Sequence, residues 1–72
     1  MFGIVLFHTS SAAMKAEKAL VRAGLAVRLV PTPRQFSSDC GFALRFDWAE
    51  EGRVAPLLAQ AGVEVEAIRP LQ

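Results

Sequence analysis

The sequence has a single cysteine, Cys40, and a single histidine, His8, among its 72 residues. One cysteine excludes an internal disulfide, and this pair, far apart in the chain, does not form a zinc-type cluster of ligands. The chain therefore has no covalent or metal cross-link to add to the stability of a small core. We expect no metal site.

Strong net charge and long apolar runs are also missing. The chain has eight Lys and Arg residues and seven Asp and Glu residues, which gives a net charge of +1. Electrostatics thus gives no case for binding nucleic acid or a membrane surface. The apolar stretch 1–7 is too short to cross a bilayer and has neither a basic start nor a cleavage pattern. We expect a cytoplasmic location, where a free thiol stays reduced.

Apolar residues make up 53% of the chain, which is high for this length. Such a content favours an efficient core, an oligomer or both. A chain this short forms one domain, and we expect it to span residues 1–72.

Hydrophobic periodicity predicts four strands and two helices. The strands are expected at 2–7, 26–30, 42–46 and 63–68, and the helices at 12–23 and 52–61. Pro31 and Pro70 are expected to end the second and fourth strands, because proline cannot donate to a sheet ladder.

The resulting order, β-α-β-β-α-β, predicts an α/β fold of the α+β type. It is typical of a ferredoxin-like sandwich, in which a four-stranded antiparallel sheet carries both helices on one face. The open face of the sheet would carry four charged residues, which are Arg28, Arg45, Glu64 and Glu66. This face would be solvated, or it would be a polar interface in a homodimer.

The predicted topology brings several polar residues to one end of the molecule. The first strand ends, the first helix begins and the third strand begins at the same edge of the sheet. His8, Thr9, Ser10 and Cys40 should therefore lie close to the loop 31–39. Because loop-forming residues flank Cys40, a reactive thiol is favoured over the alternative, an inert thiol packed at the start of a strand.

The surroundings expected for Cys40 favour its thiolate form. A helix N-terminus offers partial positive charge and unpaired N–H groups. Arg34 would add positive charge, and His8 is a candidate hydrogen-bond partner or proton acceptor. Gly41 leaves room for a partner to approach the sulfur, whereas the carboxylate of Asp39 opposes a second negative charge.

Structural roles stay open for the same residues. Thr9 and Ser10 would simply cap the first helix, or their N–H groups would hold an anion. Ser37 and Ser38 would form a turn. Arg34 would bind loop carbonyls.

Four stretches of the chain resemble one known family. They are FHTS at 7–10, AEK at 16–18, PTPR at 31–34 and SSDCGFALRF at 37–46. The family is described as "putative selenium/sulfur carrier protein-like" (DUF3343), and the resemblance covers nearly the whole chain. It implies delivery of activated sulfur or selenium as a cysteine-bound persulfide or perselenide. The carrier residue would be Cys40, within a motif of Arg34, Ser37, Ser38 and Gly41.

Three functions are compared on this basis. A carrier would accept sulfur or selenium from a donor such as a cysteine desulfurase and pass it to an acceptor protein, with no bound cofactor. A ligand- or partner-binding module of the same fold would leave Cys40 incidental. A complete thiol enzyme, such as a sulfurtransferase, has the least support, because the chain offers no resolving cysteine.

Overall fold

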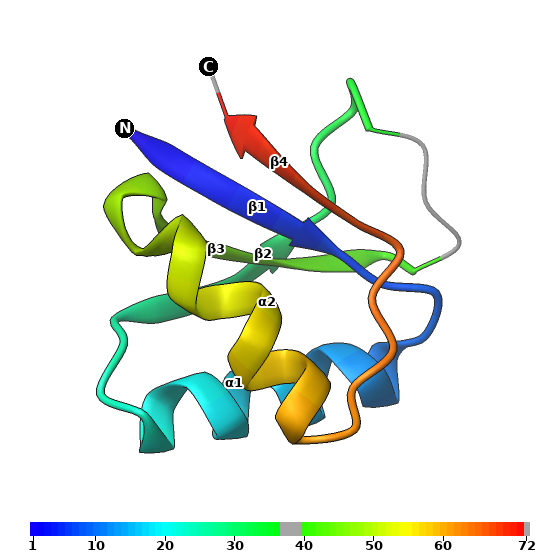
Figure 1. The fold of residues 1–72 in the computed structure, drawn as a ribbon. Helices are drawn as coiled ribbons and strands as arrows, with labels where there is room; N and C mark the ends of the chain where they lie inside the picture. The colour runs from blue at the N-terminus through cyan, green and yellow to red at the C-terminus, as the bar shows by residue number, and fades with distance from the viewer. Residues whose placement is uncertain (37–39, 72) are drawn as a thin grey trace.

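The protein is a four-stranded antiparallel sheet with two helices packed on one of its faces (Figure 1). The computed structural model describes residues 1–36 and 40–71. The elements follow in the order β1 (Phe2–Leu6), α1 (Ser10–Arg22), β2 (Val27–Pro31), β3 (Phe42–Asp47), η1 (Trp48–Glu50), α2 (Glu51–Gln60) and β4 (Ala67–Leu71). The strand order in the sheet is β2-β3-β1-β4, with every neighbouring pair antiparallel. The predicted ferredoxin-like fold is confirmed.

Helix α1 begins at a side-chain cap and ends at a glycine. The Thr9 hydroxyl accepts a hydrogen bond from the Ala12 N–H at 3.2 Å, which satisfies one of the free donors at the start of the helix. Gly24 has a φ of +86°, a conformation that glycine adopts without the strain of a side chain. The cap at Thr9 fixes the start of α1 directly after β1 and beside the start of β3.

The fourth strand differs from its predicted bounds. The apolar–acidic alternation of 63–66 lies before the strand, and β4 begins only at Ala67. The Val63 N–H donates to the Leu58 carbonyl at 3.0 Å, so this residue, three positions after α2, takes part in the hydrogen bonds that close the end of that helix. Pro70 was expected to stop the strand, but it lies within it. The reason is that β4 is an edge strand, where a missing N–H on the outer side breaks no ladder.

The same reasoning applies at the other edge of the sheet. Strand β2 is the second edge, and its last residue is Pro31, which pairs with Phe42 of β3. Pro31 thus ends β2 as predicted, as its last residue, whereas Pro70 lies inside β4.

Two apolar clusters pack on the two faces of the sheet. The larger lies between the sheet and the helices, and its fully buried side chains include Phe7, Leu20, Leu44, Phe46 and Leu58. The smaller lies on the open face and consists of Ile4, Leu6 and Ala43, with Val30, Phe36 and Ala67 against it. The sheet is thus apolar on both faces over part of its area, which accounts for the high apolar content.

The charged residues of the open face are only partly those expected. Arg28 and Arg45 lie there, directly opposite each other on β2 and β3. Glu64 and Glu66 do not, because the segment that holds them precedes β4. Arg69 of β4 and Asp47 of β3 also lie on this face, since Arg69 pairs with Ile4 and Asp47 alternates with Arg45.

Candidate functional site

Cys40 lies two residues before β3, at the edge of the sheet where α1 begins. The end of β2 holds its backbone through Thr32. The Thr32 hydroxyl donates to the Cys40 carbonyl at 2.8 Å, and the Thr32 N–H donates to the Gly41 carbonyl at 3.0 Å. The position of the cysteine is therefore set by a fixed pairing across the sheet edge.

The thiol of Cys40 points inward. Cys40 is 3% exposed and belongs to the apolar cluster between the sheet and the helices. The side chains of β3 alternate, so that Leu44 and Phe46 face the helices, and continuing this alternation backwards places Cys40 on the same side. The surroundings are thus those of the packed alternative, although exposed Gly41 and Phe42 follow directly.

Among the described residues, two polar groups reach the sulfur despite this burial. The Phe42 N–H donates to Sγ at 3.4 Å, and the Ser10 Oγ lies 3.8 Å from Sγ. Ser10 is exposed and is the first residue of α1. An anionic sulfur would have a backbone donor, a hydroxyl and the positive end of the helix close by.

Gly41 leaves the approach beside the cysteine open. It is exposed, its φ is not positive, and a Cβ atom built on it would meet nothing within 4 Å. Neither the backbone nor the packing of the described residues requires glycine at this position. The role of Gly41 in admitting a partner to the sulfur stays a prediction.

The remaining predicted residues at the start of α1 make structural contacts. Thr9 caps the helix, and its hydroxyl lies 3.4 Å from that of Ser11. The Nδ1 atom of His8 lies 3.7 Å from Oε1 of Glu66, and the Glu66 N–H donates to the Leu6 carbonyl. His8 thus faces the segment that leads into β4.

Arg34 is exposed on a turn in which the Phe36 N–H donates to the Pro33 carbonyl at 3.0 Å. Phe36 packs on the open face of the sheet, whereas Cys40 packs on the helix face. Within residues 1–36 and 40–71, Arg34 makes no hydrogen bond or ion pair. Ser37 and Ser38, together with Asp39, lie outside the residues that the structure describes.

Sequence reasoning missed two groups at this site. The Thr32 hydroxyl was read only as part of a loop motif, and the Phe42 N–H carries no signal in a sequence. A threonine before Pro33, eight residues from the cysteine, is the pattern that would have pointed to the first of them.

No helix among the described residues is long and apolar enough to cross a membrane.

Comparison with known proteins gives one family. A family model described as "Putative Se/S carrier protein-like" matches residues 2–70. No significant match was found among curated proteins or among solved structures. Because the family model covers nearly the whole chain, including the Thr32 anchor and Cys40, the protein belongs to the putative Se/S carrier protein-like family.

Proposed function

We propose that this protein carries sulfur or selenium on the Sγ atom of Cys40, as a persulfide or perselenide, between a donor and an acceptor protein. The observation that carries the proposal is the polar setting of a buried sulfur. The Phe42 N–H and the Ser10 hydroxyl both lie within hydrogen-bonding reach of Sγ, at the start of α1. The family to which the chain belongs supports the same cargo.

The proposed loading step is a transfer between two sulfur atoms. The Cys40 thiolate attacks the outer sulfur of a persulfide on the donor, for which a cysteine desulfurase is the expected class. The S–S bond of the donor breaks, its cysteine leaves as a thiolate, and a new S–S bond forms on Cys40. The transferred sulfur keeps its oxidation state, so the step requires no oxidant or reductant, and a perselenide forms in the same way.

The same polar groups act on the loaded form. A persulfide is anionic when deprotonated, and charge-assisted hydrogen bonds are roughly twice as strong as neutral ones. The Phe42 N–H is fixed by the start of β3, and the Ser10 hydroxyl is fixed by the start of α1. Exposed Ser10 and Gly41 place the sulfur one side chain below the surface, where a partner approaches it.

The test is the intact mass of the protein after incubation with a cysteine desulfurase and cysteine. We expect the wild type to gain one sulfur atom, which a reductant removes, and Cys40→Ser to gain nothing. Alkylation of the unfolded wild type confirms that the thiol is chemically intact. No adduct on a protein whose thiol is intact contradicts the carrier function.

The burial of Cys40 favours a second candidate. At 3% exposure within the main core, the side chain also fits a packed thiol in a module that binds a ligand or partner through other residues. Cys40→Ser separates the two candidates, because it abolishes loading of a carrier and leaves the binding of such a module unchanged.

A further inference from the structure

Three arginines form a single row across the open face of the sheet. The register pairs Arg28 of β2 with Arg45 of β3, Arg45 with Ile4 of β1, and Ile4 with Arg69 of β4. The row therefore crosses all four strands, with one apolar position in it. Strands lie about 4.8 Å apart, so the row extends over roughly 14 Å.

No carboxylate neutralises this row within the part of the chain that the structure describes. None of its three arginines forms an ion pair within residues 1–36 and 40–71. Asp47 stands beyond the row on β3, and its carboxylate accepts from the Ala49 N–H instead. Arg28 and Arg45 lie directly opposite each other on neighbouring strands, an arrangement of like charges that in general destabilises a sheet.

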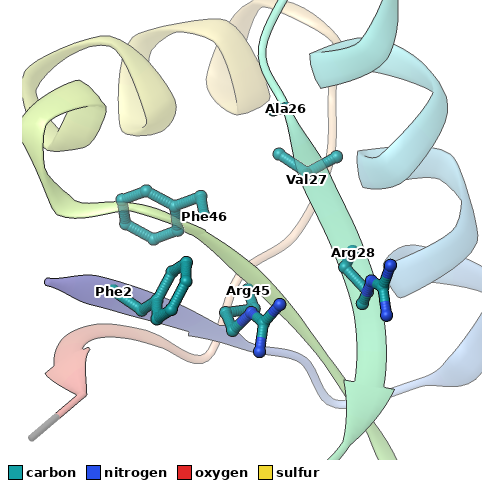
Figure 2. Close-up of a pocket in the computed structure, with 6 residues that line it drawn as sticks. All are labelled: Phe2, Ala26, Val27, Arg28, Arg45 and Phe46. Carbon is teal, nitrogen blue, oxygen red and sulfur yellow. The ribbon is translucent and has the colours of Figure 1, made fainter.

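An apolar border adjoins the row on each side. Phe2 is 47% exposed, and its ring centre lies 4.3 Å from the Cζ atom of Arg45. An open hollow of about 240 Å³ is lined by Phe2, Arg28 and Arg45, among others. Figure 2 shows the ring of Phe2 beside Arg45, with the side chain of Arg28 beyond it. On the other side lies the open-face cluster around Leu6 and Ala43.

We propose that the arginine row, Arg28, Arg45 and Arg69, docks an acidic segment of a partner protein. An extended segment that crosses the strands presents side chains on one face about every 6.8 Å, a spacing that matches carboxylates to a row of this length. Its apolar side chains would rest on the borders at Phe2 and at the open-face cluster. Calling this partner the sulfur donor or acceptor rests on the proposed carrier function, whereas the preference for carboxylates does not.

Three other occupants fit the face less well. A second copy of the chain, related by a two-fold axis, would bring its own arginine row against this one. Nucleic acid binding depends on many phosphate contacts, and the chain as a whole carries a net charge of only +1. A free small anion would find Arg28 and Arg69 exposed and the hollow open rather than enclosed.

The experiment uses a fluorescein-labelled peptide in which Glu alternates with Leu, and a matched peptide with Gln in place of Glu. Binding is measured by anisotropy at fixed ionic strength, and the site is mapped by chemical-shift changes of ¹⁵N-labelled protein. Arg28→Gln/Arg45→Gln is compared with Lys18→Gln/Arg22→Gln, which removes the same charge from the exposed side of α1. We expect shifts on β2 and β3, and a loss of affinity of at least about tenfold in the first variant only.

Several results would overturn the proposal. They are the absence of binding, equal losses in both variants, shifts confined to α1, and equal binding of the Gln peptide. If a single-stranded oligonucleotide bound more tightly than the Glu peptide, the face would be assigned to nucleic acid instead. If dimerisation of the protein competed with peptide binding, it would be assigned to a second copy of the chain.

The docking surface and the carrier function fail separately in this design. Cys40→Ser should bind the peptide as the wild type does, because the thiol packs on the other face of the sheet. Peptide binding without sulfur loading removes the carrier function and leaves the docking surface. Loading without peptide binding removes the docking surface alone.

Discussion

The Sγ atom of Cys40 lies 3.8 Å from the Oγ atom of Ser10, across 30 residues of chain. The contact joins Cys40, two residues before β3, to the first residue of α1, and these two segments meet only because β1 and β3 are neighbours in the sheet. A helix start and a thiol are thereby brought together by topology rather than by a local motif. The sulfur is held where a hydroxyl and a positive helix end both act on it.

Ser10→Ala should slow the reaction of Cys40 with iodoacetamide and with a persulfide donor. The hydroxyl donates to the thiolate, and a hydrogen bond worth about 1 kcal/mol corresponds to roughly a fivefold change in rate. The free energy of unfolding should change by less than about 0.5 kcal/mol, because Ser10 is exposed. Ser11→Ala is the matched control, since Ser11 is exposed and, among the described residues, its hydroxyl lies within hydrogen-bonding distance of the Thr9 hydroxyl alone. Equal rates in both variants would contradict a role for Ser10.

Thr32→Val should destabilise the protein by about 1 kcal/mol, because it removes the hydroxyl that donates to the Cys40 carbonyl without changing the size of the side chain. Urea unfolding followed by the fluorescence of the single tryptophan, Trp48, measures this change. The weaker anchor should also expose the thiol more often, so alkylation of Cys40 should become faster.

Thr32→Ser keeps the hydroxyl and serves as the control for this position. Its free energy of unfolding should match that of the wild type, and its alkylation rate should stay within about a factor of two of the wild-type rate. If Thr32→Val behaves as Thr32→Ser does, the bond to Cys40 holds nothing in place.

The fold followed from the sequence because its elements carry local signals. Alternation over 42–46, the cap at Thr9 and the glycines at 24 and 62 each point to one structure, and together they leave one common topology. The last strand begins later than predicted, because the Val63 N–H donates to the Leu58 carbonyl of α2, and it is the Glu66 N–H that donates to the Leu6 carbonyl of β1. Only the position of β4 at an edge permits Pro70 inside it, and edges are a property of the assembled sheet.

The site was predictable in its place but not in its exposure. The order of the elements brought Ser10 and Cys40 together as expected. The loop-like neighbours of Cys40 suggested an accessible thiol, but the direction of a side chain depends on the pleat of the strand that follows. Of the three arginines in the row, Arg28 and Arg45 were predicted on the open face of the sheet. Arg69 was not, because the register that places it there is set by strand pairing.

Gly41→Ala should leave the fold unchanged and hinder access to the thiol. The position has no positive φ and a new Cβ meets nothing within 4 Å, so the free energy of unfolding should shift by less than about 0.5 kcal/mol. Loading by a donor protein should slow more than alkylation by iodoacetamide, because only the large reactant needs the space. Gly52→Ala, far from the cysteine in sequence and also free of contacts, should leave both rates unchanged. A uniform effect on both reactants would indicate a change in the thiol itself.

Gly3→Ala tests the packing that supports β1 and β3. A Cβ at Gly3 would come within 2.5 Å of ring atoms of Phe46 and Trp48, two rings that stack with their centres 5.9 Å apart. Because Phe46 is 1% exposed and has no room to withdraw, we expect a loss of about 1–3 kcal/mol in the free energy of unfolding. The fluorescence of Trp48 should change in the folded state as well, since its ring has to move.

Gly52→Ala provides the opposite case in the same measurement. Gly52 lies in the first turns of α2, and its new methyl group meets nothing within 4 Å, so this variant should gain up to about 1 kcal/mol from helix propensity. Urea unfolding of the two variants, with the slope of the transition compared between them, separates a change in stability from a change in the compactness of either state. Equal stability of Gly3→Ala and the wild type would show that the Phe46–Trp48 pair is not held against β1. The sheet that presents both Cys40 and the arginine row would then depend on other contacts.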